Sequence, residues 1–348
     1  MRILIYGINF HPELTGTGKY TGEMARWLSD AGHDVDVVTA PPYYPQWKVL
    51  DGFSSRRYAR HGLSTQGGCI EVMRCPLWVP SNVTGLTRLL HLASFATSSV
   101  VGICWGMFRK PDMVLVVVPT LFQVPFAIVM SKLCGVPSWL HVQDFEVDAA
   151  LDMGIVKGAA SQRSWLRQMA CGLESFLMKR FDRASSITPP MVQRLQSKGV
   201  HADRCVLLPN WVGLSHIKPM SPAQSMRTEF GIQDDEFVVL YSGNMGEKQG
   251  LELIIEVAAL LKDHPKIRFL LAGTGAARDR LEKGASELGN VTWLPLQPFE
   301  KLSEFLACAD VHVLPQRADA ADLVMPSKLT GMLASGRVVV GTAAADTQ

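Results

Sequence analysis

Short apolar segments separated by stretches of helical spacing recur along the whole chain. In the first half, apolar runs of strand length stand at residues 2–6, 34–39, 69–74, 113–118, 138–142, 184–188 and 204–208. The run at 113–118, MVLVVV, is apolar at every position, which is typical of a strand covered on both faces of a parallel sheet. Between these runs, apolar residues recur every three or four positions, as in amphipathic helices. The pattern predicts an α/β fold built on a parallel sheet.

The second half repeats this alternation after a segment that lacks it. Its apolar runs stand at residues 237–241, 267–272, 291–294, 311–314 and 337–341, and helical spacing begins near Gln249, Gly275, Glu300 and Ser327. Residues 214–235 contain Pro219 and Pro222 and show no clear period, which is typical of a linker. We therefore expect an N-terminal domain at 1–213 and a C-terminal domain at 236–348, each a doubly wound α/β unit.

The stretch 237–251, FVVLYSGNMGEKQGL, combines a strand, a Gly-rich turn and a helix start. Gly243 and Gly246 let backbone N–H groups approach an anion, and the helix start adds partial positive charge. Lys248 adds a formal charge. This chemistry suits a diphosphate, while a plain strand-to-helix turn capped by glycines is the alternative.

A second segment of the same kind is residues 325–329, MPSKL. Pro326 and Ser327 are residues that open helices. Lys328 would lie in the first turn, where the helix dipole disfavours a cation. A bound anion would offset both charges, whereas a solvated surface lysine would need no ligand. Two such helix starts in one sheet together favour a diphosphate site.

Familiar nucleotide motifs do not fit residues 16–20, GTGKY. A P-loop needs Ser or Thr after its lysine and an early glycine, but Tyr20 follows Lys19 and Glu13 holds the early position. A dinucleotide fingerprint needs glycines directly after the first strand and an acid closing the second strand, which Thr39 closes instead. NAD binding is therefore disfavoured.

Composition further limits the classes of function and partner. The chain has 348 residues, of which 47% are hydrophobic, and a formal net charge of +2. This charge is too small to predict a nucleic-acid partner. The 7 cysteines are scattered, with no CxxC or Cys/His spacing for zinc. We interpret them as reduced thiols of a cytosolic protein, and the N-terminus shows no secretory pattern.

Two segments bear on membrane contact. Residues 89–108 carry no charged side chain and are long enough to span a bilayer, but His91 and several Ser and Thr residues dilute their hydrophobicity. A buried or interfacial helix is the expectation there. Residues 161–183 predict a basic amphipathic helix, which suits either anionic lipid or an ordinary solvated face. We expect a cytoplasmic protein that can lie peripherally on the inner face of the plasma membrane.

The ordered set of motifs along the chain resembles one family. The motifs are RILIYGINFHPELTGTGKYTGEMARWLSDAGHDVDVVTAPPYYP, HVQDFEVDAALDMG, ITPPMVQRL, LLPNWV, YSGNMGEKQGLELIIEVA, LLAGTGAARDRLE, ADVHVLP and VMPSKLTGMLASGR. The chain is similar to family 4 glycosyltransferases of the GT-B fold. Within them it resembles the branch that makes bacterial exopolysaccharide and O-antigen, in particular the WcaI-type transferases of colanic acid synthesis. The resemblance covers essentially the whole chain.

The resemblance implies two facing Rossmann-like domains, with a nucleotide-sugar donor held by the C-terminal one and the acceptor by the N-terminal one. The donor diphosphate would contact Gly243, Asn244, Gly246, Lys248, Gln249, Ser327 and Lys328. The nucleobase would lie near Gly273, Gly275, Pro295 and Leu296. The loop with Gly16, Gly18 and Lys19 would face the acceptor and the donor phosphate across the cleft. His141 and Asp144 would line the same cleft near the sugar, and Asp322 is the acid nearest to a family glutamate.

The reaction that the resemblance implies is metal-independent transfer with retention of anomeric configuration and no cofactor. Negative charge develops on the leaving diphosphate, where Lys248, Lys328 and backbone N–H groups would stabilise it. His141 and Asp144 complete the implied catalytic set, with no nucleophilic role for Asp144. The expected donor is GDP-L-fucose, with a UDP-activated amino sugar as the alternative, and the expected acceptor is a lipid-linked glycan.

Departures from the family pattern leave a second hypothesis open. Asn244 and Gln249 stand where many relatives carry Arg and Lys, and Gly331 stands where many carry Glu. The family normally continues with a further helical stretch beyond the position of Gln348, so the chain is expected to be truncated at its C-terminal end. A catalytically inactive homologue that binds a nucleotide or a glycan is the alternative function.

Overall fold

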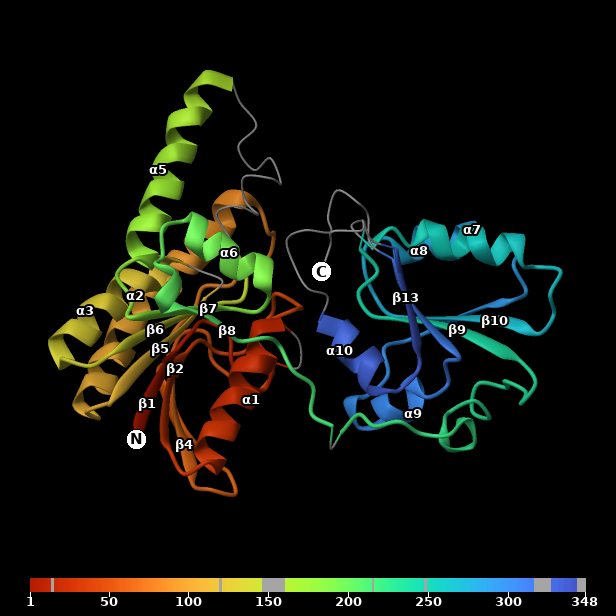
Figure 1. Ribbon diagram of the computed structural model, residues 1–348, viewed down its shortest axis with the longest axis horizontal. Helices are drawn as coiled ribbons and strands as arrows, with labels where there is room; N and C mark the ends of the chain where they lie inside the picture. The colour runs from red at the N-terminus through yellow and green to blue at the C-terminus, as the bar shows by residue number, and fades with distance from the viewer. Residues whose placement is uncertain are drawn as a thin grey trace. The chain divides into compact units, whose positions relative to one another are not determined.

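The computed structural model describes residues 1–13, 16–118, 121–145, 160–214, 216–246, 249–315 and 327–342, with the backbone alone at 160–167 and 327. The chain divides into two compact units, Met1–Pro209 and Asn210–Gln348. Each unit has its own sheet and its own hydrophobic core. The predicted pair of doubly wound α/β units is confirmed (Figure 1).

Unit 1 is built on an 8-stranded sheet in the order β3-β4-β2-β1-β5-β6-β7-β8. Its strands are β1 (Arg2–Tyr6), β2 (Asp34–Thr39), β3 (Ala59–Ser64), β4 (Cys69–Arg74), β5 (Met113–Val118), β6 (Ser138–Val142), β7 (Arg183–Ser186) and β8 (Cys205–Leu207). Its helices are α1 (Gly16–Asp30), α2 (Gly85–Phe108), α3 (Val124–Cys134), α5 (Ala160–Met178) and α6 (Pro189–Ser197), with the 3-10 turns η1 (Leu121–Gln123) and η2 (Ala202–Arg204). The strand order reverses between β1 and β5, and the crevice beyond their carboxyl ends is where such sheets bind ligands.

Strand β3 is an element that the hydrophobic pattern did not predict. It pairs antiparallel with β4, whereas the other neighbouring strands of this sheet are parallel. Its sequence, ARHGLS, is largely polar and mostly exposed, because β3 is an edge strand. A hairpin closed by the hydrogen bond from Thr65 N–H to Gly68 O (2.9 Å) holds it in place.

Helices cover both faces of the unit 1 sheet, because alternate strand residues point to opposite sides. Helix α1 packs on the face that carries Ile3 and Ile5. Helix α2 lies so close to the other face that a Cβ at Gly106 would be 2.8 Å from Leu4 Cδ2. By length and composition α2 could cross a membrane, yet 44% of its most apolar window is buried within the unit. The predicted buried helix is therefore confirmed for one of its faces.

Unit 2 has a 5-stranded parallel sheet in the order β11-β10-β9-β12-β13. Its strands are β9 (Phe237–Ser242), β10 (Ile267–Ala272), β11 (Val291–Leu294), β12 (Val311–Pro315) and β13 (Val338–Thr342). Its helices are α7 (Glu252–Leu260), α8 (Arg278–Gly284), α9 (Leu302–Leu306) and α10 (Ser327–Ala334), with the 3-10 turns η3 (Pro222–Gln224) and η5 (Phe299–Lys301). The central strand β9 alternates between two core clusters, and the order reverses between β9 and β12. Ligand binding is therefore expected beyond the carboxyl end of β9.

Candidate active site

The Gly-rich turn after β9 is bonded to the turn that follows the neighbouring strand β10. Gly243 N–H donates to Ala272 O (2.9 Å), Met245 N–H donates to Thr274 O (2.9 Å), and Ala277 N–H donates back to Met245 O (2.9 Å). Met245 is fully buried beneath this contact. The two turns therefore form one rigid edge at the carboxyl end of the sheet.

Gly273 and Gly275 allow these turns to touch. A Cβ at Gly273 would overlap the carbonyl oxygen of Gly243, and one at Gly275 would lie 2.5 Å from the Met245 carbonyl carbon. Both glycines also have positive φ angles, +158° and +155°. Their absence of side chains is thus explained by backbone packing within unit 2, before any ligand is considered.

Helix α10 brings Lys328 to the same edge. Lys328 Nζ donates to the Tyr241 hydroxyl (2.8 Å) and lies 4.0 Å from the centroid of the Tyr241 ring. Its Cδ is 3.2 Å from where a Cβ of Gly243 would stand. The start of the Gly-rich turn, at Gly243, and Lys328 of the second segment that the sequence singled out therefore lie together in unit 2.

The ammonium of Lys328 is partly withdrawn from water. Burial lowers the pKa of Lys328 to about 8. Within the described part of the chain, no carboxylate forms an ion pair with it. A desolvated cation beside a glycine turn gains energy when an anion binds, because an opposite charge restores its protonated form.

The other predicted phosphate contacts are only partly visible. Asn244 is exposed, and the Gln249 carboxamide lies over Gly246, with its Oε1 buried and without a hydrogen-bond partner among the residues that the structure describes. Helix α7 begins at Glu252 rather than near Gln249, so its N-terminus lies further from the turn than predicted. Lys248, Asp322 and the Ser327 side chain lie outside the described residues.

The predicted nucleobase region follows strands β10 and β11. Arg278 Nη1 donates to the carbonyl oxygens of Gly273 and, at 3.1 Å, Leu294. It thereby joins the loop after β10 to the loop that carries Pro295 and Leu296. Leu296 is 51% exposed, so an apolar surface is available beside this joint.

In unit 1, the residues Gly16, Gly18 and Lys19 form the start of α1. Gly16 has a φ of +60°, and Gly18 packs directly on the carboxylate of Glu13. Lys19 Nζ is 3.9 Å from Glu23 Oε1, one helical turn away. The glycines thus fit α1 to the loop after β1, and Lys19 lies at the ligand-binding end of this sheet.

Buried Glu13 organises the loops at that end. Its carboxylate accepts hydrogen bonds from Asn9 Nδ2 and from the N–H groups of Tyr43 and Tyr44, each at 3.0 Å. Burial raises the pKa of Glu13 despite these bonds. One carboxylate therefore ties together the loops after β1 and β2 and the first turn of α1.

His141 lies within β6, not at its end, and is 1% exposed. Its Nδ1 is 2.8 Å from Ser185 Oγ on β7, and its Nε2 is 2.9 Å from Gln143 Nε2. Burial lowers the pKa of His141 to about 4. Both ring nitrogens are engaged, so the ring is held between Ser185 and Gln143. The place of His141 near the donor sugar stays a prediction. Asp144, one residue beyond Gln143, is half-buried.

Comparison with known proteins identifies the chain. Residues 15–211 match the family model "Glycosyl transferase 4-like domain", and residues 223–345 match "Glycosyl transferases group 1". The chain is a glycosyltransferase of this family. Over 353 aligned residues it is 44% identical to the putative colanic acid biosynthesis glycosyl transferase WcaI of Escherichia coli, covering 100% of this chain and 84% of that relative.

Solved structures show that this glycosyltransferase has the GT-B fold. Sucrose-phosphate synthase from Thermosynechococcus elongatus superposes with a TM-score of 0.69 at 18% identity, covering 98% of this chain and 81% of that one. WaaG, a glycosyltransferase involved in lipopolysaccharide biosynthesis, gives 0.64 at 15% identity, with 97% and 80% coverage. HepE of Anabaena in complex with UDP and glucose gives 0.61 at 14%, with 98% and 80% coverage.

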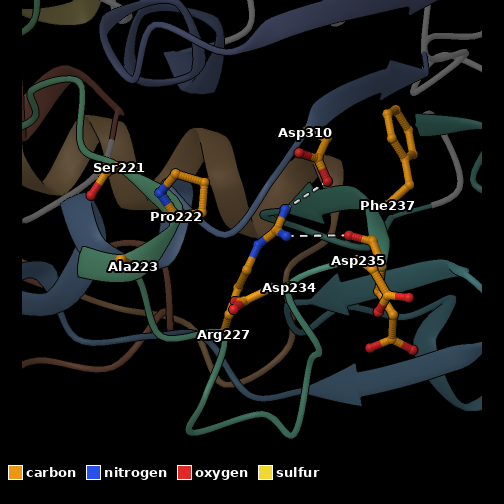
Figure 2. A pocket seen from close by; sticks show the side chains of 9 residues that line it. Ser221, Pro222, Ala223, Arg227, Asp234, Asp235, Phe237 and Asp310 are labelled. Carbon is orange, nitrogen blue, oxygen red and sulfur yellow. Dashed lines mark hydrogen bonds and ion pairs between the residues drawn. The ribbon is translucent and has the colours of Figure 1, made fainter.

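Unit 2 of the glycosyltransferase also has a cavity of about 450 Å³ (Figure 2), and its lining does not include Lys328 or the glycine turn. It is lined by Phe237, the first residue of β9, and by Asp310, which directly precedes β12. Arg227 also lines it, donating to Asp310 Oδ2 (2.6 Å) and Glu236 O (3.2 Å). The cavity is therefore at the amino ends of the strands, opposite the carboxyl-end edge that carries Lys328.

Acid should destabilise unit 1 of the glycosyltransferase through His141. In the unfolded chain the imidazole of His141 has its ordinary pKa of 6.5, whereas in the folded protein burial lowers this pKa to about 4. The free energy of unfolding should thus fall by about 3 kcal/mol as the pH is lowered through this window. Urea titrations at pH 7 and pH 4.5, followed by tryptophan fluorescence, measure this change. A His141→Gln variant should lose most of it, and an unchanged pH dependence in that variant would count against the assignment.

Proposed function

We propose that this glycosyltransferase moves a sugar from a nucleotide-sugar donor held by unit 2 to a lipid-linked glycan, with retention of configuration and without a metal. The observation that carries the proposal is Lys328, half-buried and without a carboxylate partner in the described residues, lying against Tyr241 and Gly243. The pathway we propose is the synthesis of colanic acid or a related exopolysaccharide, which is supported by the name of the relative WcaI.

The proposed step breaks the bond between the sugar C1 and the diphosphate oxygen and forms a bond between C1 and an acceptor hydroxyl oxygen on the same face. The acceptor proton passes to the leaving phosphate oxygen. Lys328 stabilises the charge that develops on this phosphate. The N–H groups of Gly243 and Met245 already donate to carbonyls. Lys328 and, as the sequence implies, Lys248 supply the formal positive charge.

We further propose GDP-L-fucose as the donor, with a UDP-activated amino sugar as the competing candidate. Solved relatives include HepE with UDP and glucose and starch synthase IV with ADP, so the fold itself accepts different nucleotides. Isothermal titration with GDP and UDP separates the candidates. Binding of GDP at least about tenfold tighter than UDP, a difference of about 1.4 kcal/mol, is the expected result.

The direct test of the proposed function is transfer of radiolabel from a panel of nucleotide sugars to membrane lipid extracts. Incorporation of label into the lipid fraction from one nucleotide sugar is expected. The transferred sugar should keep the anomeric configuration that it has in the donor. Binding of a nucleotide without hydrolysis or transfer, for every sugar and extract, would instead support the inactive binding homologue.

Diphosphate binding should weaken at alkaline pH. In the free protein Lys328 loses its proton as the pH rises through about 8, because burial lowers its pKa to that value. Affinity for GDP or UDP should therefore be about tenfold lower at pH 9 than at pH 7. Isothermal titration over this range measures the change. A Lys328→Met variant should bind weakly and with little pH dependence, and an equally steep dependence in this variant would assign the titration to another group.

We also propose that unit 1 lies against anionic lipid at the inner face of the plasma membrane. Large apolar side chains are exposed on the outer faces of α2 and α3, namely Leu86, Leu89, Leu90, Val101, Phe108, Val129 and Leu133. Exposed Lys132 lies on α3, and exposed Lys110 follows the end of α2, so both can meet anionic head groups.

Liposome flotation tests this surface. The wild type should float with vesicles that contain anionic phospholipid, and the double variant Leu89→Gln/Leu90→Gln should float several-fold less. Leu260→Gln is the control, since Leu260 is 80% exposed but belongs to unit 2. Failure of the wild type to float, or an equal loss in the control, would remove the proposal.

A further inference from the structure

The hydroxyl of Tyr241 connects two parts of the proposed donor site, the glycine turn at residues 243–246 and Lys328. We call these two parts together the donor edge. Tyr241 is the penultimate residue of β9, and its side chain is fully buried. Its hydroxyl donates to the carbonyl oxygen of Asn244 (2.6 Å) in the glycine turn. The same oxygen accepts a hydrogen bond from Lys328 Nζ (2.8 Å), the cation at the start of α10. A single oxygen atom therefore sets the distance between the turn and the lysine.

We infer that Tyr241 is a positioning residue for the diphosphate of the donor, acting through Lys328. The inference rests on the proposed function of this edge. Tyr241 itself does not touch the ligand. It holds the ammonium of Lys328 above Gly243, and it holds the Asn244 backbone below, so that the turn and the cation present one surface to the phosphates.

A neutral hydroxyl suits this task better than a carboxylate would. A carboxylate would fix the lysine equally well, but it would neutralise the charge that a diphosphate needs. The Tyr241 hydroxyl accepts a hydrogen bond from Nζ, and its ring face, 4.0 Å from Nζ, stabilises the cation through its quadrupole. Burial raises the pKa of Tyr241, so the hydroxyl keeps its proton and donates it to Asn244 O.

The side chain of Lys328 has little other support in the described residues. It passes over Gly243, where a Cβ would lie 3.2 Å from its Cδ, so a side chain at this position would crowd the lysine. Loss of the Tyr241 hydroxyl would leave the ammonium free to rotate away from the turn. Binding of a diphosphate would then have to order the Lys328 side chain again, which lowers the affinity.

The test is a Tyr241→Phe variant, which keeps the ring and removes only the oxygen. Isothermal titration with GDP, UDP and inorganic pyrophosphate should show about tenfold weaker binding for all three, the effect of one hydrogen bond to a charged group. Tyr6→Phe is the matched control. Tyr6 is also a fully buried strand tyrosine, but its hydroxyl bonds Ser99 Oγ (2.5 Å) in unit 1. It should change thermal stability and leave the affinities unchanged.

A double-mutant cycle separates positioning from a general loss of structure. In a Lys328→Met background, Tyr241→Phe should cause no further loss of pyrophosphate affinity, because the group it positions is gone. Equal, additive losses in both backgrounds would overturn the inference, as would wild-type affinity in Tyr241→Phe. A loss confined to GDP and UDP, without pyrophosphate, would also overturn it. If Lys328→Met alone binds pyrophosphate as the wild type does, the proposed donor site fails instead.

Discussion

Replacing Lys328 by methionine is expected to lower kcat for sugar transfer by about 100- to 1,000-fold, the usual effect of removing one group that stabilises transition-state charge. Methionine keeps the length and apolar stem of lysine but cannot offset the charge of the leaving diphosphate. The measurement is the initial rate of radiolabel transfer with saturating donor. Because Lys328 is half-buried and has no carboxylate partner in the described residues, its loss leaves no uncompensated carboxylate there.

Lys283→Met is the control for this experiment. Lys283 is an exposed lysine of α8 in the same unit, and its replacement should leave kcat within about twofold of the wild type. Thermal melts of both variants should lie close to the wild type. A Lys328→Met enzyme that is folded and transfers sugar at the wild-type rate would contradict the proposed role of this edge.

Gly273→Ala is expected to have the largest effect on unit 2. A Cβ at this position would overlap the Gly243 carbonyl oxygen, and the φ of +158° is unfavourable for any residue with a side chain. The two turns would have to separate, at a cost of about 3–5 kcal/mol in the free energy of unfolding. Chemical denaturation of unit 2 measures the loss, and nucleoside diphosphate binding should fall with it.

Gly284→Ala is the matched control. Gly284 ends α8, and a Cβ there would meet no atom within 4 Å. Alanine has the higher helix propensity, so the variant should be as stable as the wild type or slightly more stable. Equal stability of the Gly273 and Gly284 variants would show that the turns are not packed as described.

Much of the fold could be predicted because its signal is local. The apolar run of β9 and the glycines after it are adjacent in sequence, and the first turn of α10 carries its own helix-opening residues. Strand β3 escaped prediction because an exposed edge strand has no apolar run. The start of α7 was placed near Gln249 because Leu251 and Ile254 continue the period, whereas the structure begins the helix at Glu252.

The side-chain contacts of the site were less accessible to sequence reasoning. The resemblance implies that His141 lines the cleft, whereas the hydrogen bond that holds its ring depends on the register of β6 with Ser185 of β7. In the sequence Tyr241 is only one position of an apolar run, and its contact with Lys328, far along the chain, arises from the fold. In the sequence Glu13 only argues against a P-loop. In the structure its carboxylate joins two loops of unit 1. These contacts depend on tertiary packing.

The electrostatics of the donor edge differ from a simple anion-binding turn. The N–H groups of Gly243 and Met245 hold the turns together, and α7 begins beyond the turn with an acidic residue, Glu252, in its first turn. Glu252 is bonded to Arg280 (2.6 Å). These two N–H groups are thus not free for an anion, which increases the share of the charge that the lysines must supply.

The most direct measurement is a crystal structure of the glycosyltransferase soaked with a nucleoside diphosphate, either GDP or UDP. We predict that a phosphate oxygen will lie within about 3 Å of Lys328 Nζ, a hydrogen-bond distance, with the diphosphate over residues 243–246. Density for the diphosphate bound elsewhere, with Lys328 still donating only to Tyr241, would contradict the account.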